Sequence, residues 1–175
     1  MARWTMSEVY TGVNGDITIS KSDNVVGDTL TTKTLYDDRV GGVHFLSKGS
    51  INLYDANMKY VMPFSRGELF YVPDPSVGLL INRTVNFVTE TDATFYCIIS
   101  IQGTELLGTS TEIAAGDSVN LTDLNGKRML LIEAATVNGV AYPAETILKF
   151  ETIDSATIEA GAEDTLAIVF YEAPV

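Results

Sequence analysis

Thr94-Phe95-Tyr96-Cys97-Ile98-Ile99-Ser100-Ile101 is the most apolar segment of the chain, and it decides the fold class. It is rich in β-branched and aromatic residues and too short for a buried helix, so it predicts a central β-strand. Similar short segments, separated by Gly, Pro, Asn and Asp, indicate further strands. The strands predicted in this way are Asp16–Ser20, Val43–Leu46, Ile51–Tyr54, Lys59–Met62, Glu68–Val72, Leu79–Ile81, Thr84–Val88, Arg128–Glu133, Val140–Tyr142, Thr146–Glu151, Ala156–Glu159 and Thr165–Glu172.

Signals for helices are almost absent from the sequence. No window keeps apolar residues at positions i, i+3, i+4 and i+7 over three turns with caps at both ends. A parallel sheet is disfavoured because it needs crossover helices. We therefore expect an all-β fold with very little helix, namely an antiparallel β-sandwich or jelly roll.

Two similar corners link some of the predicted strands, and we call them the repeated corners, Glu112–Leu121 and Thr157–Leu166. Each passes from an apolar residue through a small-residue turn with glycine to an acid, a hydroxyl residue and a new strand. Glycine permits a tight bend, and the polar side chains can cap free backbone amides. We expect each repeated corner to carry the chain from one sheet to the other.

Asn138-Gly139 indicates a different kind of turn, the type I′ turn of a two-residue β-hairpin. Both residues of that turn need positive φ angles, which asparagine and glycine tolerate best. We expect the turn to lie between the strands Arg128–Glu133 and Val140–Tyr142.

The first 42 residues differ from the rest, because Thr, Asp, Asn, Gly and Ser dominate and apolar residues are scattered. We expect an extended N-terminal arm with one short strand at residues 1–42, and a β-sandwich domain at residues 43–175. Long structureless stretches are uncommon in compact domains unless they are functional or disordered, so the arm is expected to contact a partner or a sister subunit. The contact residues expected are Trp4, Tyr10, Tyr36 and Arg39.

Charge and hydropathy exclude two classes of partner. Eleven basic residues against 23 acidic ones give a net charge of −12, and no basic run is longer than Lys127-Arg128. Phosphate backbones and anionic membranes bind clustered positive charge, so neither nucleic acid nor a membrane is expected as a partner. The start of the chain lacks the apolar segment of a secretory signal, so we expect synthesis in the cytoplasm.

Catalytic and metal-binding patterns are not found. Histidine and cysteine occur once each, as His44 and Cys97, both in predicted strands. A thiol within the central strand is expected to be buried and unreactive. Asp123–Gly126 lacks the later glutamate of a calcium loop. We expect no catalytic residue, no cofactor and no metal ion, hence no enzyme. A hydrolase with paired carboxylates is the weakest alternative.

The corner at Ala114–Leu121 and the polar stretch before Gly41-Gly42, in an acidic series of strands, resemble capsid decoration or cement proteins of tailed bacteriophages. This resemblance implies a non-enzymatic homo-oligomer, a trimer, that binds capsid protein on the virion surface. Tyr10–Ile19 is similar to the opening of phage tail-tube proteins, which leaves a tail structural protein as one alternative. Exposed aromatic residues on a β-sandwich leave a carbohydrate-binding module as another.

Overall fold

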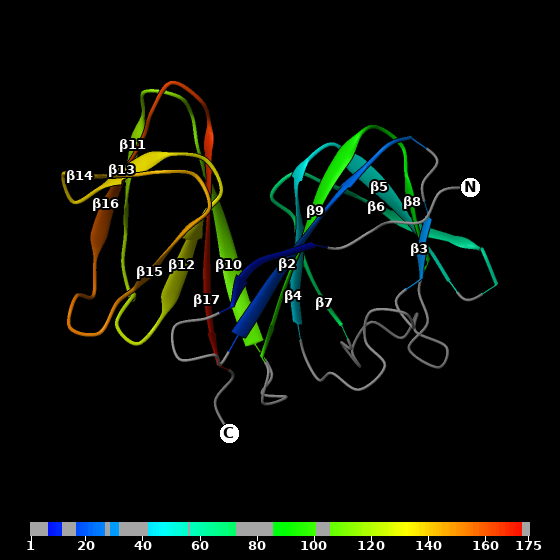
Figure 1. Ribbon diagram of the computed structural model, residues 1–175, viewed down its shortest axis with the longest axis horizontal. Coiled ribbons are helices and arrows are strands. Elements are labelled where there is room, and N and C mark those ends of the chain that lie inside the picture. The colour runs from blue at the N-terminus through cyan, green and yellow to red at the C-terminus, as the bar shows by residue number, and fades with distance from the viewer. Residues whose placement is uncertain are drawn as a thin grey trace. The chain divides into compact units, whose positions relative to one another are not determined.

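The computed structural model describes residues 7–11, 17–26, 29–31, 42–55, 57–72, 86–100 and 106–172, with backbone alone for residues 7–11, 29–31, 70–72 and 99. The chain divides into two compact units, unit 1 (Met1–Leu106 with Val175) and unit 2 (Leu107–Pro174). Their regular elements, among the described residues, are strands that pair in antiparallel ladders (Figure 1). The predicted all-β fold class is confirmed.

Unit 1 contains two sheets. The five-stranded sheet has the order β1 (Ser7–Thr11), β2 (Ile17–Asn24), β9 (Ala93–Ser100), β4 (Gly42–Lys48), β7 (Leu69–Val72). The four-stranded sheet has the order β3 (Thr29–Thr31), β8 (Asn86–Thr89), β5 (Ser50–Tyr54), β6 (Tyr60–Ser65). The segment that decides the fold class is β9, which lies inside its sheet between β2 and β4, as predicted.

Unit 2 also contains two sheets, each with four strands. The first has the order β10 (Leu106–Ile113), β17 (Thr165–Glu172), β12 (Arg128–Leu131), β15 (Thr146–Lys149). The second has the order β11 (Ser118–Leu121), β16 (Ala156–Ala160), β13 (Ala135–Val137), β14 (Val140–Tyr142).

The two units share one topology. If the strands β2 to β9 of unit 1 and β10 to β17 of unit 2 are each numbered from one to eight, both units have sheets in the orders 1-8-3-6 and 2-7-4-5. This is the order of an eight-stranded jelly roll, and β1 is an additional edge strand of unit 1. The chain is therefore two jelly rolls in tandem, an internal repeat of topology that the sequence analysis did not detect.

The repeated corners join the two sheets of unit 2, as predicted, since one lies between β10 and β11 and the other between β16 and β17. They are also hydrogen-bonded to each other. The amide of Gly116 donates to the carbonyl oxygen of Gly161 at 3.1 Å, and the amide of Ala115 donates to Oδ1 of Asp164 at 2.9 Å. Gly116 has a φ of 78°, the positive angle that favours glycine at such a bend.

The Asn138-Gly139 turn has the predicted positive φ angles, 49° and 80°. It joins β13 to β14, with Val137 opposite Val140. The expected partner strand Arg128–Glu133 was wrong, because its strand β12 pairs with β15 and β17 in the other sheet. The sequence pattern shows an apolar strand at this place but not the crossing between sheets that follows Leu131.

The N-terminal part differs from the expected arm. The boundary between the units follows Leu106, not residue 42. Strand β2 pairs with β9 along its whole length and buries Ile17 and Ile19. The predicted strand Asp16–Ser20 covers only its first half, because the polar residues that follow conceal the rest in the sequence, although Ser22 and Asn24 are buried as well. The remaining stretches of the expected arm, residues 1–6, 12–16, 27–28 and 32–41, lie outside the described residues, as does the predicted strand Leu79–Ile81.

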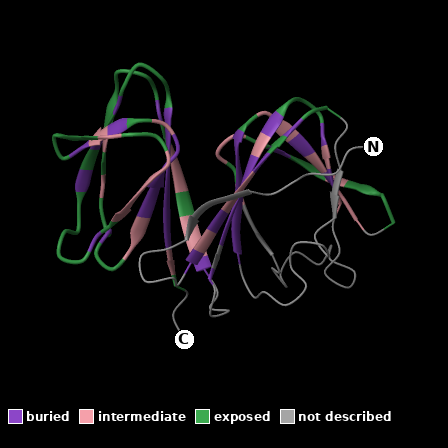
Figure 2. Ribbon diagram, viewed as in Figure 1, coloured by how far each residue is buried: buried purple, intermediate pink, exposed green. Residues whose placement is uncertain are grey.

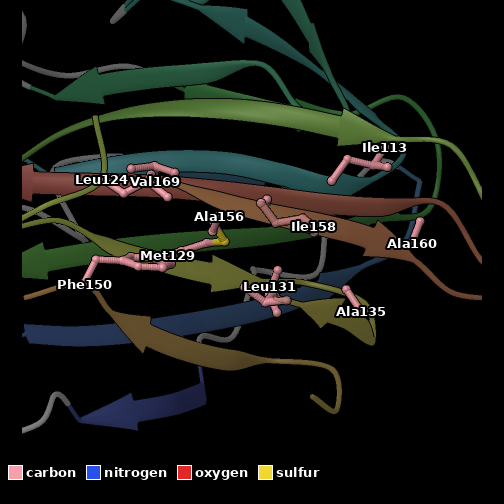
Figure 3. Close-up of a cluster of buried hydrophobic side chains, with 12 residues drawn as sticks. Ile113, Leu124, Met129, Leu131, Ala135, Phe150, Ala156, Ile158, Ala160 and Val169 are labelled. Atoms are coloured by element: carbon pink, nitrogen blue, oxygen red, sulfur yellow. The ribbon is translucent and has the colours of Figure 1, made fainter. Parts of the chain in front are cut away.

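The core of unit 2 is apolar. Buried side chains from both of its sheets meet there, as Figure 3 shows for Met129, Leu131 and Ile158. Cross-strand pairs within this core are apolar on both sides, for example Met129 with Val169. Figure 2 shows buried residues within strands of this unit, such as β12 and β16, and exposed residues in its connecting loops. Within the described residues no helix is long and apolar enough to cross a membrane.

This core allows a matched test of stability. Ile158 is fully buried in strand β16, whereas Ile153 is 49% exposed. Ile158→Ala is expected to lower the free energy of unfolding of unit 2 by about 2–5 kcal/mol, because it removes packed methyl groups and leaves a cavity. Ile153→Ala is expected to change it by no more than about 0.5 kcal/mol. Urea denaturation of both variants measures this, and equal losses would contradict the placement of β16.

Candidate functional site

The candidate site lies on one face of the five-stranded sheet of unit 1. The ring of Phe95 in β9 lies 6.0 Å from the ring of Phe87 in β8, a strand of the opposite sheet. The face that carries Phe95 therefore looks towards the interior of the jelly roll. By the strand registers, this inner face includes Ser20, Ser22 and Asn24 of β2, Gly42, His44 and Leu46 of β4, and Ala93, Phe95 and Cys97 of β9.

The only histidine and the only cysteine of the chain are direct neighbours on this inner face. In the antiparallel pairing of β4 with β9, His44 lies opposite Cys97. Side chains at such positions lie on the same face, with Cβ atoms about 4.5–5.5 Å apart. Both residues are buried, with exposed fractions of 0% and 1%. The structure thus brings together an imidazole and a thiol that are 53 positions apart in sequence (97 − 44).

Packing fixes the position of the imidazole of His44. Its ring is stacked with the ring of Phe95, with centroids 6.0 Å apart and planes 11° apart. Its other edge lies over Gly42, where an added Cβ would be only 2.7 Å from Nε2. The ring therefore occupies space that any other residue at position 42 would fill.

Burial also fixes the charge of this ring. Loss of solvent lowers the pKa of His44 from 6.5 to about 3, because the protonated form is no longer hydrated. At neutral pH the imidazole is uncharged, with one nitrogen that donates and one that accepts a hydrogen bond. Such a ring can recognise either a donor or an acceptor.

Further uncharged polar groups lie inside the same jelly roll. The hydroxyl of Ser22 donates to Oδ1 of Asn24 at 2.8 Å, and the side-chain amide of Asn24 donates to the carbonyl oxygen of Ser22 at 3.1 Å. Thr89, which is also buried, donates to the carbonyl oxygen of Val25 at 2.5 Å. The polar residues that are buried among the described residues are serine, threonine, asparagine and His44, so none of them carries a charge at neutral pH.

The two jelly rolls differ most at this point. Strands β12 and β17 of unit 2 hold the third and eighth places of their fold, as β4 and β9 do in unit 1. Their inward pairs are Met129 with Val169 and Leu131 with Ala167, all apolar. The imidazole and thiol of unit 1 therefore occupy strands whose paired counterparts are apolar. The polar side chain buried in β17 is that of Thr165, at the start of the strand, and its hydroxyl donates to the carbonyl oxygen of Ala134 at 3.3 Å.

Comparison with known proteins identifies the fold. No protein-family model and no curated protein matches the sequence. Among solved structures, a cupin 2 conserved barrel domain protein from Leptotrichia buccalis matches with a TM-score of 0.51 and 9% identity over 97% of this chain and 89% of that one. The bacterial pirin YhhW from Escherichia coli, solved with nickel(II), matches with a TM-score of 0.56 and 8% identity over 97% and 92%. At such identities the likeness shows the cupin-type fold alone.

An enzyme is also among the matches. Oxalate decarboxylase from Bacillus subtilis, a protein with Mn(II) centres, has a TM-score of 0.53 and 9% identity over 90% of this chain and 69% of that one. The fold thus occurs in enzymes, and the expectation that this chain is not an enzyme gains no support from it.

These matches correct the expected identity. The resemblance to capsid decoration proteins was wrong, because the solved structures that cover nearly the whole chain have the cupin-type fold. The tail-tube and carbohydrate-binding alternatives gain no support from them either. The resemblance rested on composition and on one corner motif, and acidic, Thr- and Gly-rich strands are shared by many β-folds.

The described residues do not fit the divalent metals named with two of these structures. Transition metals in proteins are held by several His, Cys, Asp or Glu ligands. This chain has one histidine and one cysteine in total. Among the residues that the structure describes, no group of three or more such side chains could hold a metal ion. No metal-dependent step is derived for this chain.

The residues selected from the sequence as contacts stay a prediction, because the structure does not describe their side chains. Trp4, Tyr36 and Arg39 are outside the described residues, and Tyr10 is described only by its backbone in β1. Sequence reasoning noted His44 and Cys97 singly but did not pair them. The missed signal was that both lie in apolar strand segments, where a polar side chain has to point into a core or towards a site.

Burial of the His44 imidazole predicts how the stability of the protein depends on pH. Since the folded protein has the lower pKa, only the unfolded chain binds the proton between pH 6.5 and 3, and stability is lost as the pH falls through this range. Between pH 7 and pH 5 this residue is expected to lower the free energy of unfolding by about 2 kcal/mol. His44→Leu is expected to remove this contribution to the pH dependence. Urea denaturation of both proteins at each pH measures their free energies of unfolding. If the free energy of unfolding fell equally with pH in the wild type and in His44→Leu, the prediction would be contradicted.

Proposed function

We propose that unit 1 binds an uncharged small molecule on its inner face, beside His44 and Cys97. The observation that carries this proposal is the polar cross-strand pair in the interior of unit 1, where unit 2, with the same topology, has apolar pairs. A polar pair in a core, even when it is hydrogen-bonded, adds little stability over an apolar pair of the same shape. A binding site is a reason for a fold to keep such a pair.

The chemistry of the inner face defines the class of ligand. A neutral imidazole can exchange one hydrogen bond as donor and one as acceptor, and the thiol of Cys97 is a weak donor. The rings of Phe87 and Phe95 lie 6.0 Å apart near this pair and make its surroundings apolar and aromatic. A planar ligand with a few hydrogen-bonding atoms satisfies both features.

Charge restricts the class of ligand further. A charged ligand in a buried site needs an opposite charge beside it, because the cost of removing an ion from water is several kcal/mol. The buried polar residues that the structure describes offer none. The described residues also provide no ionised acid or base at this place, so they support binding rather than catalysis.

Along strand β6 the described side chains differ in exposure. Phe64 is 8% exposed, whereas Met62, two residues away on the same side of that strand, is 38% exposed. Phe64 lies opposite Ile51 and Met62 opposite Leu53 in β5. The interior of this jelly roll thus approaches solvent at Met62, which we propose as the side of entry.

A titration followed by NMR tests the proposal. The chain has one histidine, so the Cε1–H resonance of its imidazole needs no assignment against other histidines. A library of uncharged heteroaromatic fragments, with carboxylate and amine analogues of each, is added to the folded protein. We expect some uncharged members to shift this resonance and their charged analogues to bind at least about tenfold more weakly.

Variants separate this site from adventitious binding. His44→Leu is expected to lower the affinity for those fragments at least about tenfold, since a hydrogen bond to the imidazole is lost. Met129→Leu, a volume-conserving change in the core of unit 2, serves as the control and is expected to leave their affinity unchanged. Fragments that bind His44→Leu as tightly as the wild type, or a library that never shifts the resonance, would overturn the proposal.

A further inference from the structure

We infer that Gly42 is a positioning residue for the imidazole of His44, and that the absence of a side chain at position 42 sets where Nε2 lies in the proposed binding site. Its link to binding rests on the function proposed above, whereas the positioning itself rests on the geometry of β4. Gly42 and His44 are two residues apart in this strand, so both lie on the inner face.

The space at Gly42 is occupied by the histidine ring. A Cβ built on Gly42 would lie 2.7 Å from Nε2 and 3.0 Å from Cε1 of His44, and 3.2 Å from the carbonyl oxygen of Ile98. The distance to Nε2 is shorter than real Cβ contacts, so a side chain at position 42 would require the ring to shift, whereas the distance to Cε1 is at the lower limit of such contacts. The backbone contact is less severe, because a shift of a few tenths of an ångström relieves it.

Backbone conformation does not explain this glycine. Gly49, Gly116, Gly126 and Gly139 have φ angles of 77°, 78°, 79° and 80°, which other residues rarely adopt. Gly42 is in an extended strand without a positive φ, so an alanine there is compatible with the backbone. What excludes a larger residue is the ring of His44.

The ring has little freedom to avoid a new side chain. Phe95 is stacked on it, and Cys97 lies opposite on the neighbouring strand. A methyl group at position 42 therefore has to tilt or displace the imidazole instead of the strand, because Nε2 and Cε1 are at the free end of the side chain. The hydrogen-bonding nitrogen would then present itself to a ligand in a different direction.

Gly42→Ala tests this inference, with Gly161→Ala as the matched control. Gly161 also lacks a positive φ, and the nearest atom to its added Cβ would be 3.7 Å away, an ordinary contact. We expect Gly42→Ala to shift the Cε1–H resonance of His44 and to lower the folding equilibrium constant about tenfold through overpacking. Gly161→Ala is expected to leave the resonance in place.

A double-mutant cycle distinguishes positioning from a general intolerance of alanine. In a His44→Ala background, where no ring is present, Gly42→Ala is expected to lower the folding constant by less than about threefold. The same loss in both backgrounds, or an unmoved resonance in Gly42→Ala, would overturn the inference. If Gly42→Ala does not fold, a folded Gly42→Ala/His44→Ala protein supports it, and failure of both to fold places the obstacle at Ile98 and overturns it.

The test of the positioning role of Gly42 does not depend on whether the protein binds a ligand. If the fragments fail to bind the wild type but Gly42→Ala moves the ring and the cycle shows coupling, the proposed function fails while the positioning role holds. If fragments bind the wild type and Gly42→Ala equally well with an unmoved ring, the site holds and Gly42 has no such role.

Discussion

The burial of an uncharged imidazole is the constraint on which the inner face of unit 1 depends. Protonation of His44 would place a positive charge among the buried residues of unit 1, and those that the structure describes include no acid. The ring therefore keeps its place between Gly42 and Phe95 only while it is neutral. The same low-dielectric surroundings strengthen each hydrogen bond that the ring makes. One physical cause thus accounts both for the pKa of His44 and for its suitability to recognise an uncharged molecule.

The two jelly rolls show how one topology serves two purposes. Both have sheets in the same strand order, but the inward pairs of β12 and β17 in unit 2 are apolar, whereas the inward pair His44 and Cys97 of β4 and β9 in unit 1 is polar. The sequence predicts much of this framework, including β9, β17, the repeated corners and the Asn138-Gly139 turn. It does not reveal the tandem arrangement, because two units can share a strand order without sharing residues. It also hides the second half of β2, where Ser22 and Asn24 are typical of a loop although they are buried.

The site was harder to predict from the sequence than the fold. His44 and Cys97 are each recognisable as strand residues, but their pairing depends on the register between β4 and β9, which lie far apart in the chain. Periodicity gives the face of a strand and does not give its partner or its register. The role of Gly42 is hidden in the same way, since a glycine in a strand has many possible reasons and only the coordinates show what fills its place.

The most direct test of this account is the pH titration of the imidazole itself, followed through its Cε1–H resonance in the folded protein. The account predicts no titration shift between pH 8 and about pH 4.5, because the pKa of His44 is lowered to about 3. A sigmoidal shift with a midpoint near 6.5, while dispersed amide resonances show that the protein remains folded, would contradict it. Such a result would place the ring in solvent and remove the neutral buried pair from which the binding site is argued.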